Sequence, residues 1–122
     1  MADIKAVLFD VGGVLTSSPF SAILEYEKEK QLGDGFFRRV LVKGQAFRDL
    51  ESGKLSVRDF VREFERECEG KLDAADWLAH LGRSMLPRQA FKEAVLEMKA
   101  SGRLVGIITN NWQGTLRNLL PW

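Results

Sequence analysis

Near its two ends the chain carries short uninterrupted apolar runs rather than spaced hydrophobic stripes. The first run, residues 6–9 (AVLF), ends in Asp10 and is followed by the turn residues Gly12 and Gly13. A short apolar run bounded by turn residues predicts a strand buried on both faces, as in a parallel α/β sheet. Ligands of such sheets bind just beyond the carboxyl ends of the strands, so Asp10 is a candidate ligand-binding residue. A strand that simply stops at a polar residue and a glycine turn fits the same pattern equally well.

The second run, residues 103–108, also ends in polar residues, Thr109 and Asn110. Between the two runs the apolar positions recur with helical spacing, most clearly from Val57 to Cys68. The predicted helical segments begin at Pro19, Phe36, Ala46, Val57, Ala74, Arg88 and Gln113, and the breaks that follow them are Gly33, Gly44, Ser52, Gly70, Pro87, Gly102 and Pro121.

Helix capping residues support two of these boundaries. Ser56 is the expected N-cap of the clearest helix, with Asp59 completing a capping box. Ser17 or Ser18 is expected to cap the helix that starts at Pro19. The apolar stripe predicted for that helix contains Phe20, Ile23, Leu24 and either Tyr26 or Glu27.

The order of the elements predicts an α/β fold. A strand, several helices, one further helix and a second strand suit a parallel strand pair of the βαβ type. The helices between Pro19 and Met85 are too many for a single crossover connection. We therefore predict a partial core, residues 1–16 and 87–122, and an inserted all-helical cap, residues 17–86.

Composition narrows the class of protein. The chain has 122 residues, of which 45% are hydrophobic and 29% charged, as in an ordinary soluble domain. A net charge of +1 gives no bulk attraction to nucleic acid or to a membrane surface. The single cysteine excludes an internal disulfide framework and fits a reducing compartment. With no signal-peptide pattern and no apolar run near the roughly 18 residues of a membrane span, a cytoplasmic location is expected.

The two strand ends together resemble the haloacid dehalogenase superfamily. Residues 9–15 (FDVGGVL) are similar to its first motif, in which an aspartate at a strand end is a nucleophile. Residues 107–112 (IITNNW) are similar to its second motif, a strand that ends in Thr or Ser and is commonly followed by Asn. A helical cap directly after the first motif also occurs in this superfamily. The chain resembles in particular the N-terminal phosphatase-type domain of soluble epoxide hydrolase and that of haloacid-dehalogenase-containing acyl-CoA dehydrogenases.

The resemblance implies a role for each matching residue. Asp10 would attack a phosphoryl group and would also bind Mg²⁺, with the backbone carbonyl of Gly12 as a second metal ligand. Thr109 would donate its hydroxyl hydrogen to the phosphoryl oxygens, and the backbone N–H of Asn110 would add a donor. The implied substrate is a small phosphorylated molecule.

Three departures from the family pattern bear on activity. Gly12 stands where phosphatases of this family carry a second aspartate, which acts as general acid and base. The family's lysine and its later acidic pair would lie beyond Trp122, so the resemblance implies a C-terminally truncated core. A two-stranded sheet leaves unpaired edges and an uncovered apolar face, and we expect a second copy or another partner to cover them.

Two functional hypotheses therefore stand side by side. The first is a Mg²⁺-dependent phosphoric-ester hydrolase, impaired by the missing groups. The second is a catalytically silent relative that serves as an interaction or structural module.

Four other side chains have structural interpretations. His80, the only histidine, is expected to be a surface or cap residue rather than a metal ligand. Cys68 is expected to be a small buried apolar residue and Trp77 an anchor of cap packing. Trp112 lies beside the candidate site in sequence, but core packing is favoured over a role in substrate binding.

Overall fold

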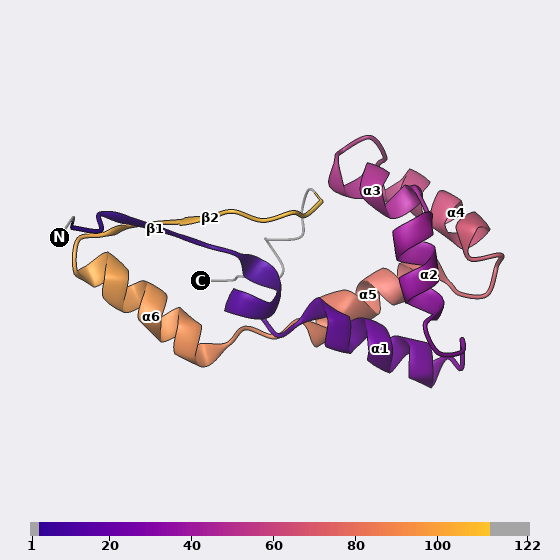
Figure 1. Cartoon of the computed structure of the whole chain (residues 1–122), viewed down its shortest axis with the longest axis horizontal. Helices are drawn as coiled ribbons and strands as arrows, with labels where there is room; N and C mark the ends of the chain where they lie inside the picture. The colour runs from indigo at the N-terminus through magenta and orange to yellow at the C-terminus, as the bar shows by residue number, and fades with distance from the viewer. Residues whose placement is uncertain (1–2, 113–122) are drawn as a thin grey trace.

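The computed structural model describes residues 3–112 as an elongated molecule with two lobes (Figure 1). The sheet lobe contains both strands, the turn after the first strand and the last helix; the helical lobe contains the five helices between them. Within residues 3–112, no helix combines the length and apolar character that a membrane crossing needs. The elements are β1 (Ala6–Phe9), the wide turn η1 (Val11–Leu15), α1 (Pro19–Glu29), α2 (Phe36–Lys43), α3 (Ala46–Glu51), α4 (Val57–Glu67), α5 (Ala74–Ser84), α6 (Gln89–Ala100) and β2 (Leu104–Ile107).

The predicted helices and strands are found close to their expected positions. Ser18 is the N-cap of α1, and its hydroxyl accepts a hydrogen bond from the Phe20 N–H (3.2 Å). Ser56 caps α4 by accepting from the Asp59 N–H (3.1 Å), while the Ser56 hydroxyl donates to the Asp59 carboxylate (2.8 Å). The helix expected from Gln113 lies outside the described residues.

β1 and β2 form a two-stranded parallel sheet, which confirms the predicted α/β class. Their register pairs Ala6 with Leu104 and Phe9 with Ile107. Helix α6 covers one face, where Val95 packs with Phe9. The opposite face is open, as expected for two strands: Leu8 and Leu104, on that face, are 64% and 73% exposed. Burial of the first strand on both faces, suggested by its continuous apolar run, is therefore wrong for the described chain, because only α6 packs on the sheet.

Aromatic side chains form the core of the helical lobe. Trp77 of α5 is fully buried, which confirms its expected role as an anchor. Its ring stacks on Phe37 of α2 and on Phe64 of α4, with ring centroids 5.3 and 4.8 Å apart. One tryptophan thus ties three helices together, and stacked pairs of this kind add about 1 kcal/mol beyond the area they bury.

The apolar stripe predicted for α1 is wrong in part. Phe20 and Leu24 are exposed, whereas Tyr26 and Glu27, the two alternatives for the last position of the stripe, are buried together with Ala22. The carboxylate of Glu27 accepts hydrogen bonds from the backbone N–H groups of residues 35 (2.7 Å) and 37 (2.9 Å), at the start of α2. Those charge-assisted bonds fix the rotation of α1 about its axis, and they override its hydrophobic pattern.

The two connections between the lobes run side by side. Thr16 forms an antiparallel bridge with Pro87, and the Ser17 N–H donates to the Leu86 carbonyl (2.8 Å). The Ser17 hydroxyl donates to the Ser84 carbonyl (2.9 Å) and accepts from the Leu86 N–H (3.0 Å). The crossing coincides with the predicted limits of the cap, whose status as a separate domain stays a prediction.

Removing the Ser17 hydroxyl should loosen this crossing. Ser17→Ala leaves the Leu86 N–H and the Ser84 carbonyl without this partner, so we expect the free energy of unfolding to fall by about 1–2 kcal/mol in a urea titration. Ser52→Ala is the control: its exposed hydroxyl makes a single long bond (3.4 Å), and a change within about 0.5 kcal/mol is expected. Equal stabilities for the two variants would show that the crossing does not depend on Ser17.

Candidate functional site

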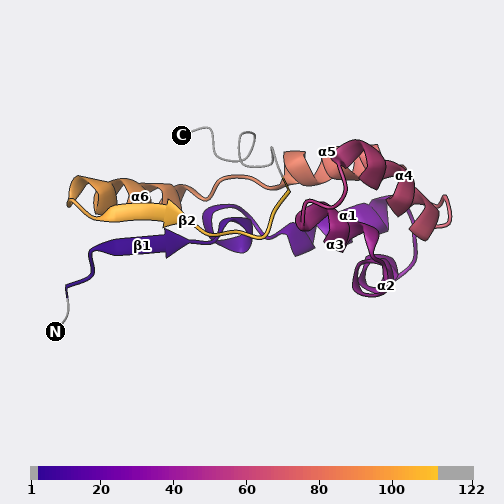
Figure 2. The same cartoon turned by 90° about the horizontal axis from the view of Figure 1, so that it is seen from above.

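The carboxyl ends of β1 and β2 bring the two sequence motifs to one edge of the sheet. The parallel pairing continues past the strands, since the Ile108 N–H donates to the Phe9 carbonyl (2.9 Å). Asp10 and Thr109 are the next residues on the two paths, so both leave the sheet at the same edge. Figure 2 shows β1 and β2 running side by side in the same direction. Thr109 is partly buried there, and Asp10 and Asn110 are exposed.

The Asp10 carboxylate starts the turn that follows it. Its Oδ1 accepts a hydrogen bond from the Val11 N–H (2.7 Å). Its other oxygen has no hydrogen-bond partner among residues 3–112. One carboxylate oxygen is therefore held in place while the second is available to a ligand at the sheet edge.

The wide turn η1 is shaped by glycine and by Thr16. The Thr16 N–H and hydroxyl both point to the Val11 carbonyl, at 3.1 and 3.3 Å, which closes the turn five residues after it begins. Gly13 has φ +79°, in the left-handed region that disfavours side chains. Gly12 has φ −63° and ψ 120°, which any residue adopts, but a Cβ there would lie 3.3 Å from the Cδ of Pro19. Gly12 thus leaves room for the start of α1.

Arg88, which sequence reasoning did not select, braces this turn from the other chain segment. Its guanidinium donates to the Gly13 carbonyl (3.2 Å) and lies over the ring of Phe91, 4.6 Å from its centroid. Its backbone N–H donates to the Leu15 carbonyl (2.8 Å). A lone arginine before a helix gives no sequence signal for such a role, because the contact spans more than seventy positions.

Two oxygens at this edge are suited to a hard cation. The second Asp10 oxygen accepts no hydrogen bond within residues 3–112, and the Gly12 carbonyl lies two residues further along, in the turn η1. The same residues contain no group of three or more His, Cys, Asp or Glu side chains with metal-binding geometry. A carboxylate and a backbone carbonyl are oxygen ligands of the kind that Mg²⁺ takes, with water completing its shell.

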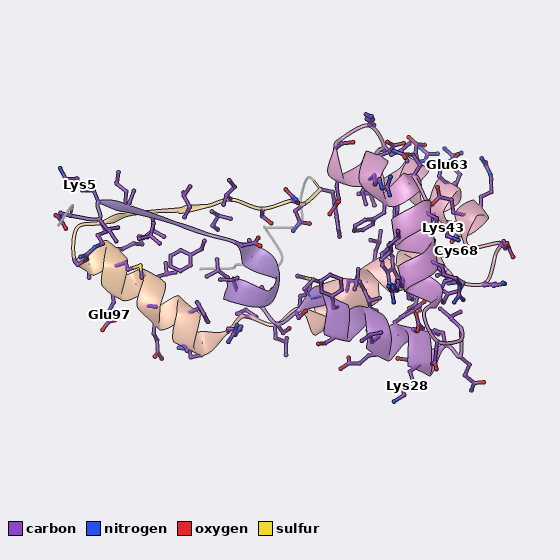
Figure 3. The ribbon with its side chains drawn as sticks, viewed as in Figure 1. Lys5, Lys28, Lys43, Glu63, Cys68 and Glu97 are labelled. Atoms are coloured by element: carbon purple, nitrogen blue, oxygen red, sulfur yellow. The ribbon has the colours of Figure 1, made fainter. Side chains whose placement is uncertain are left out.

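His80 and Cys68 lie in the helical lobe, away from the strand ends. The Nε2 of His80 is 3.0 Å from the Ala22 carbonyl and 3.3 Å from the Ser84 hydroxyl, so this side chain joins α1 to α5. Cys68 is buried, as expected (Figure 3). Burial first, and then the nearby charges of Glu67 and Glu65, raise the pKa of its thiol to about 12. A thiol held protonated in this way is a poor nucleophile.

Trp112 packs into the core of the helical lobe, which confirms the interpretation favoured for it. Its ring meets Phe47 of α3 edge-on, with centroids 6.1 Å apart. The segment that carries Thr109 and Asn110 is thereby attached at both ends, to β1 through Ile108 and to α3 through Trp112. This attachment limits how far Thr109 can move from Asp10.

Two open hollows border the helical lobe. One, of about 590 Å³, borders α1 and the loop after it and is lined by Leu24, Glu25 and Asp34. Another, of about 510 Å³, borders α2 and the end of α4 and is lined by Arg39, Lys43 and Glu67. Glu67 caps α3 by accepting from the Gln45 N–H (2.7 Å), so its carboxylate has a structural role.

Comparison with known proteins gives a distant relationship. No family model matches the chain. Mouse acyl-CoA dehydrogenase family member 10 is 23% identical to it over 117 residues, which cover 88% of this chain and 11% of that protein. The chain thus spans about a tenth of the length of this relative. At that identity and coverage the similarity links the chain to one segment of that protein and assigns no activity.

Proposed function

We propose that this chain is a haloacid dehalogenase-like hydrolase domain of the Mg²⁺-dependent phosphatase type, with Asp10 as its nucleophile. The observation that carries the proposal is the parallel register of β1 and β2, which brings Asp10 and Thr109 to one edge. The similarity to part of an acyl-CoA dehydrogenase family member agrees with the resemblance drawn from the two motifs.

The proposed reaction proceeds in two displacements at phosphorus. The available oxygen of Asp10 attacks the phosphoryl group, the bond from phosphorus to the leaving oxygen breaks, and an aspartyl phosphate forms. The Thr109 hydroxyl and the Asn110 N–H donate to the phosphoryl oxygens. Water then attacks the aspartyl phosphate, which releases inorganic phosphate and restores the carboxylate. Mg²⁺ bound by Asp10 and the Gly12 carbonyl would neutralise charge on the phosphoryl group.

Gly12 sets the limit on this chemistry. A glycine has no side chain to protonate the leaving oxygen, so the departing anion must take its proton from water. Proton transfer by a positioned side chain contributes about 10²–10⁴-fold in rate, and that factor is missing here. Substrates whose leaving groups are stable anions, such as aryl phosphates, should therefore be hydrolysed in preference to alkyl phosphates.

A silent interaction module is the second candidate function. It is favoured by the same Gly12 and by the lack, within residues 3–112, of any group of three or more His, Cys, Asp or Glu side chains that could hold a metal ion. On this alternative the strand-end geometry is an inherited feature of the fold, and the surface of the domain has the function.

Hydrolysis of an aryl phosphate tests the proposal. We expect turnover that requires Mg²⁺ and that falls to the buffer rate in Asp10→Asn, since the amide is not a nucleophile. Asp34→Asn removes an exposed carboxylate in the loop before α2 and should keep the wild-type rate. Wild-type protein no faster than Asp10→Asn would refute the hydrolase and leave the interaction module.

Restoring a carboxylate at position 12 should increase activity toward alkyl phosphates. Gly12→Asp supplies a proton donor on a backbone that accepts any residue, with Pro19 moving by a few tenths of an ångström. We expect a gain of about 10²-fold, larger for alkyl than for aryl phosphates, in steady-state kinetics. Gly12→Asn matches the new side chain in size but transfers no proton, and it should show no gain. Equal rates for the folded Asp and Asn variants would contradict the assigned role of this position.

A further inference from the structure

Glu51, the last residue of α3, lies on the side of that helix that meets the segment following β2. The contact is made by Trp112, whose ring lies edge-on to the ring of Phe47, with centroids 6.1 Å apart. Residues four apart share one face of a helix, so Glu51 lies one turn beyond Phe47 on this side of α3. Figure 1 shows the segment after β2 arriving beside α3.

This side of α3 borders the region into which a bound phosphate ester would extend. Trp112 is two residues after Asn110, so the chain between them spans at most about 7 Å. In phosphoryl transfer the leaving oxygen lies opposite the attacking oxygen, here that of Asp10. The helical lobe lies beyond the carboxyl ends of both strands (Figure 2). A leaving group that points away from the sheet edge would therefore extend toward the helical lobe.

The carboxylate of Glu51 has no structural partner. Within residues 3–112 its side chain makes no hydrogen bond or ion pair. Neighbouring charges are engaged elsewhere, since Asp49 pairs with Lys54 (3.9 Å) and Arg48 donates to the Val42 carbonyl. Glu51 also stands at the negative end of the α3 dipole, where a carboxylate is unfavourable. The fold thus gains no contact from this charge.

Glu51 is both accessible and partly desolvated. The residue is exposed at the surface, so a ligand can reach it. The protein around it nevertheless raises the pKa of its carboxyl above the usual value, because partial burial disfavours the charged form. A carboxylate that has lost part of its hydration attracts a cation more strongly than one in open water. A cation on a ligand would supply the partner that the described chain does not.

We propose that Glu51 is a specificity residue that binds an ammonium group at the far end of an elongated phosphate ester whose phosphoryl group binds at the strand ends. The inference rests on the proposed hydrolase function and names its substrate class. An ammonium group is favoured over a neutral hydroxyl because the end of α3 adds negative potential to that of Glu51. The ester must be elongated because α3 is reached from Asn110 through Trp112 and Phe47.

Two aryl phosphates of equal size test this assignment: 4-(2-aminoethyl)phenyl phosphate and its uncharged counterpart 4-propylphenyl phosphate. With Mg²⁺, kcat/KM of the wild-type protein should be about tenfold higher for the ammonium ester, mainly through a lower KM. In Glu51→Gln the ratio of the two kcat/KM values should fall to about one. Glu97→Gln is the matched control, because it removes the same charge from an exposed position on α6 (Figure 3), and it should keep the wild-type ratio.

Equilibrium binding separates this inference from the hydrolase chemistry. Asp10→Asn cannot form an aspartyl phosphate, so calorimetry with Mg²⁺ can measure the dissociation constants of both esters without turnover. We expect Asp10→Asn to bind the ammonium ester about tenfold more tightly than 4-propylphenyl phosphate, and the double variant with Glu51→Gln to bind both equally. The same preference in a wild-type protein without turnover would refute the hydrolase and keep Glu51 as a ligand-binding residue.

Three results would overturn the assignment of Glu51. One is an equal ratio in wild type and Glu51→Gln, in turnover and in binding. Another is a failure of both esters to bind. The third is a preference that Glu97→Gln loses to the same extent, which would show that the net charge of the protein attracts the ammonium group. Thermal unfolding checks the fold: Glu51→Gln should be at least as stable as wild type, because it removes an unpartnered charge from the negative end of α3.

Discussion

Parallel hydrogen bonding between β1 and β2 is the constraint on which the rest of the structure depends. It joins residues about a hundred positions apart, from Lys5 and Leu104 at one end to Phe9 and Ile108 at the other. Because the paired strands run in the same direction, the chain that leaves the carboxyl end of β1 must return to the other end of the sheet before β2 begins. The helical lobe forms most of this connection. The segment that enters the lobe and the segment that leaves it lie side by side at Thr16 and Pro87. The candidate site exists because the same pairing brings Asp10 and Thr109 out at one edge.

The two lobes differ in how much apolar packing stabilises them. The helical lobe has an aromatic core around Trp77, whereas the buried apolar residues of the sheet lobe are Val11, Leu15 and Val95. Apolar burial is the main favourable term in folding, so the sheet lobe gains less from its own packing. The polar contact from Arg88 to the turn, within the sheet lobe, and the contact from Trp112 to α3, in the helical lobe, therefore matter for holding the strand ends.

Local patterns predicted the elements, and long-range contacts decided what the patterns left open. The sequence correctly predicted the ends of the two strands, just before Asp10 and Thr109, and the helix N-cap at Ser56. Each of these features depends only on neighbouring residues. Phe20 and Leu24 were placed inward wrongly, since the backbone bonds accepted by Glu27 set the rotation of α1. Burial of β1 on both faces was also wrong, because an apolar run shows what a strand tolerates and not which helices cover it. Core packing of Trp112 was predicted, but its contact with Phe47 and the contact of Arg88 with the turn were not, as each joins segments far apart in sequence. The roles assigned to Asp10, Gly12, Thr109 and Asn110 stay predictions.

Amide NMR during titration with inorganic phosphate, with and without Mg²⁺, tests the central claim most directly, because it needs no turnover. If the two strand ends form one phosphoryl-binding edge, saturable shifts should appear together at residues 10–13 and 109–111, and only with Mg²⁺ present. Shifts confined to one strand end, or spread over surface lysines and arginines without saturation, would contradict the account.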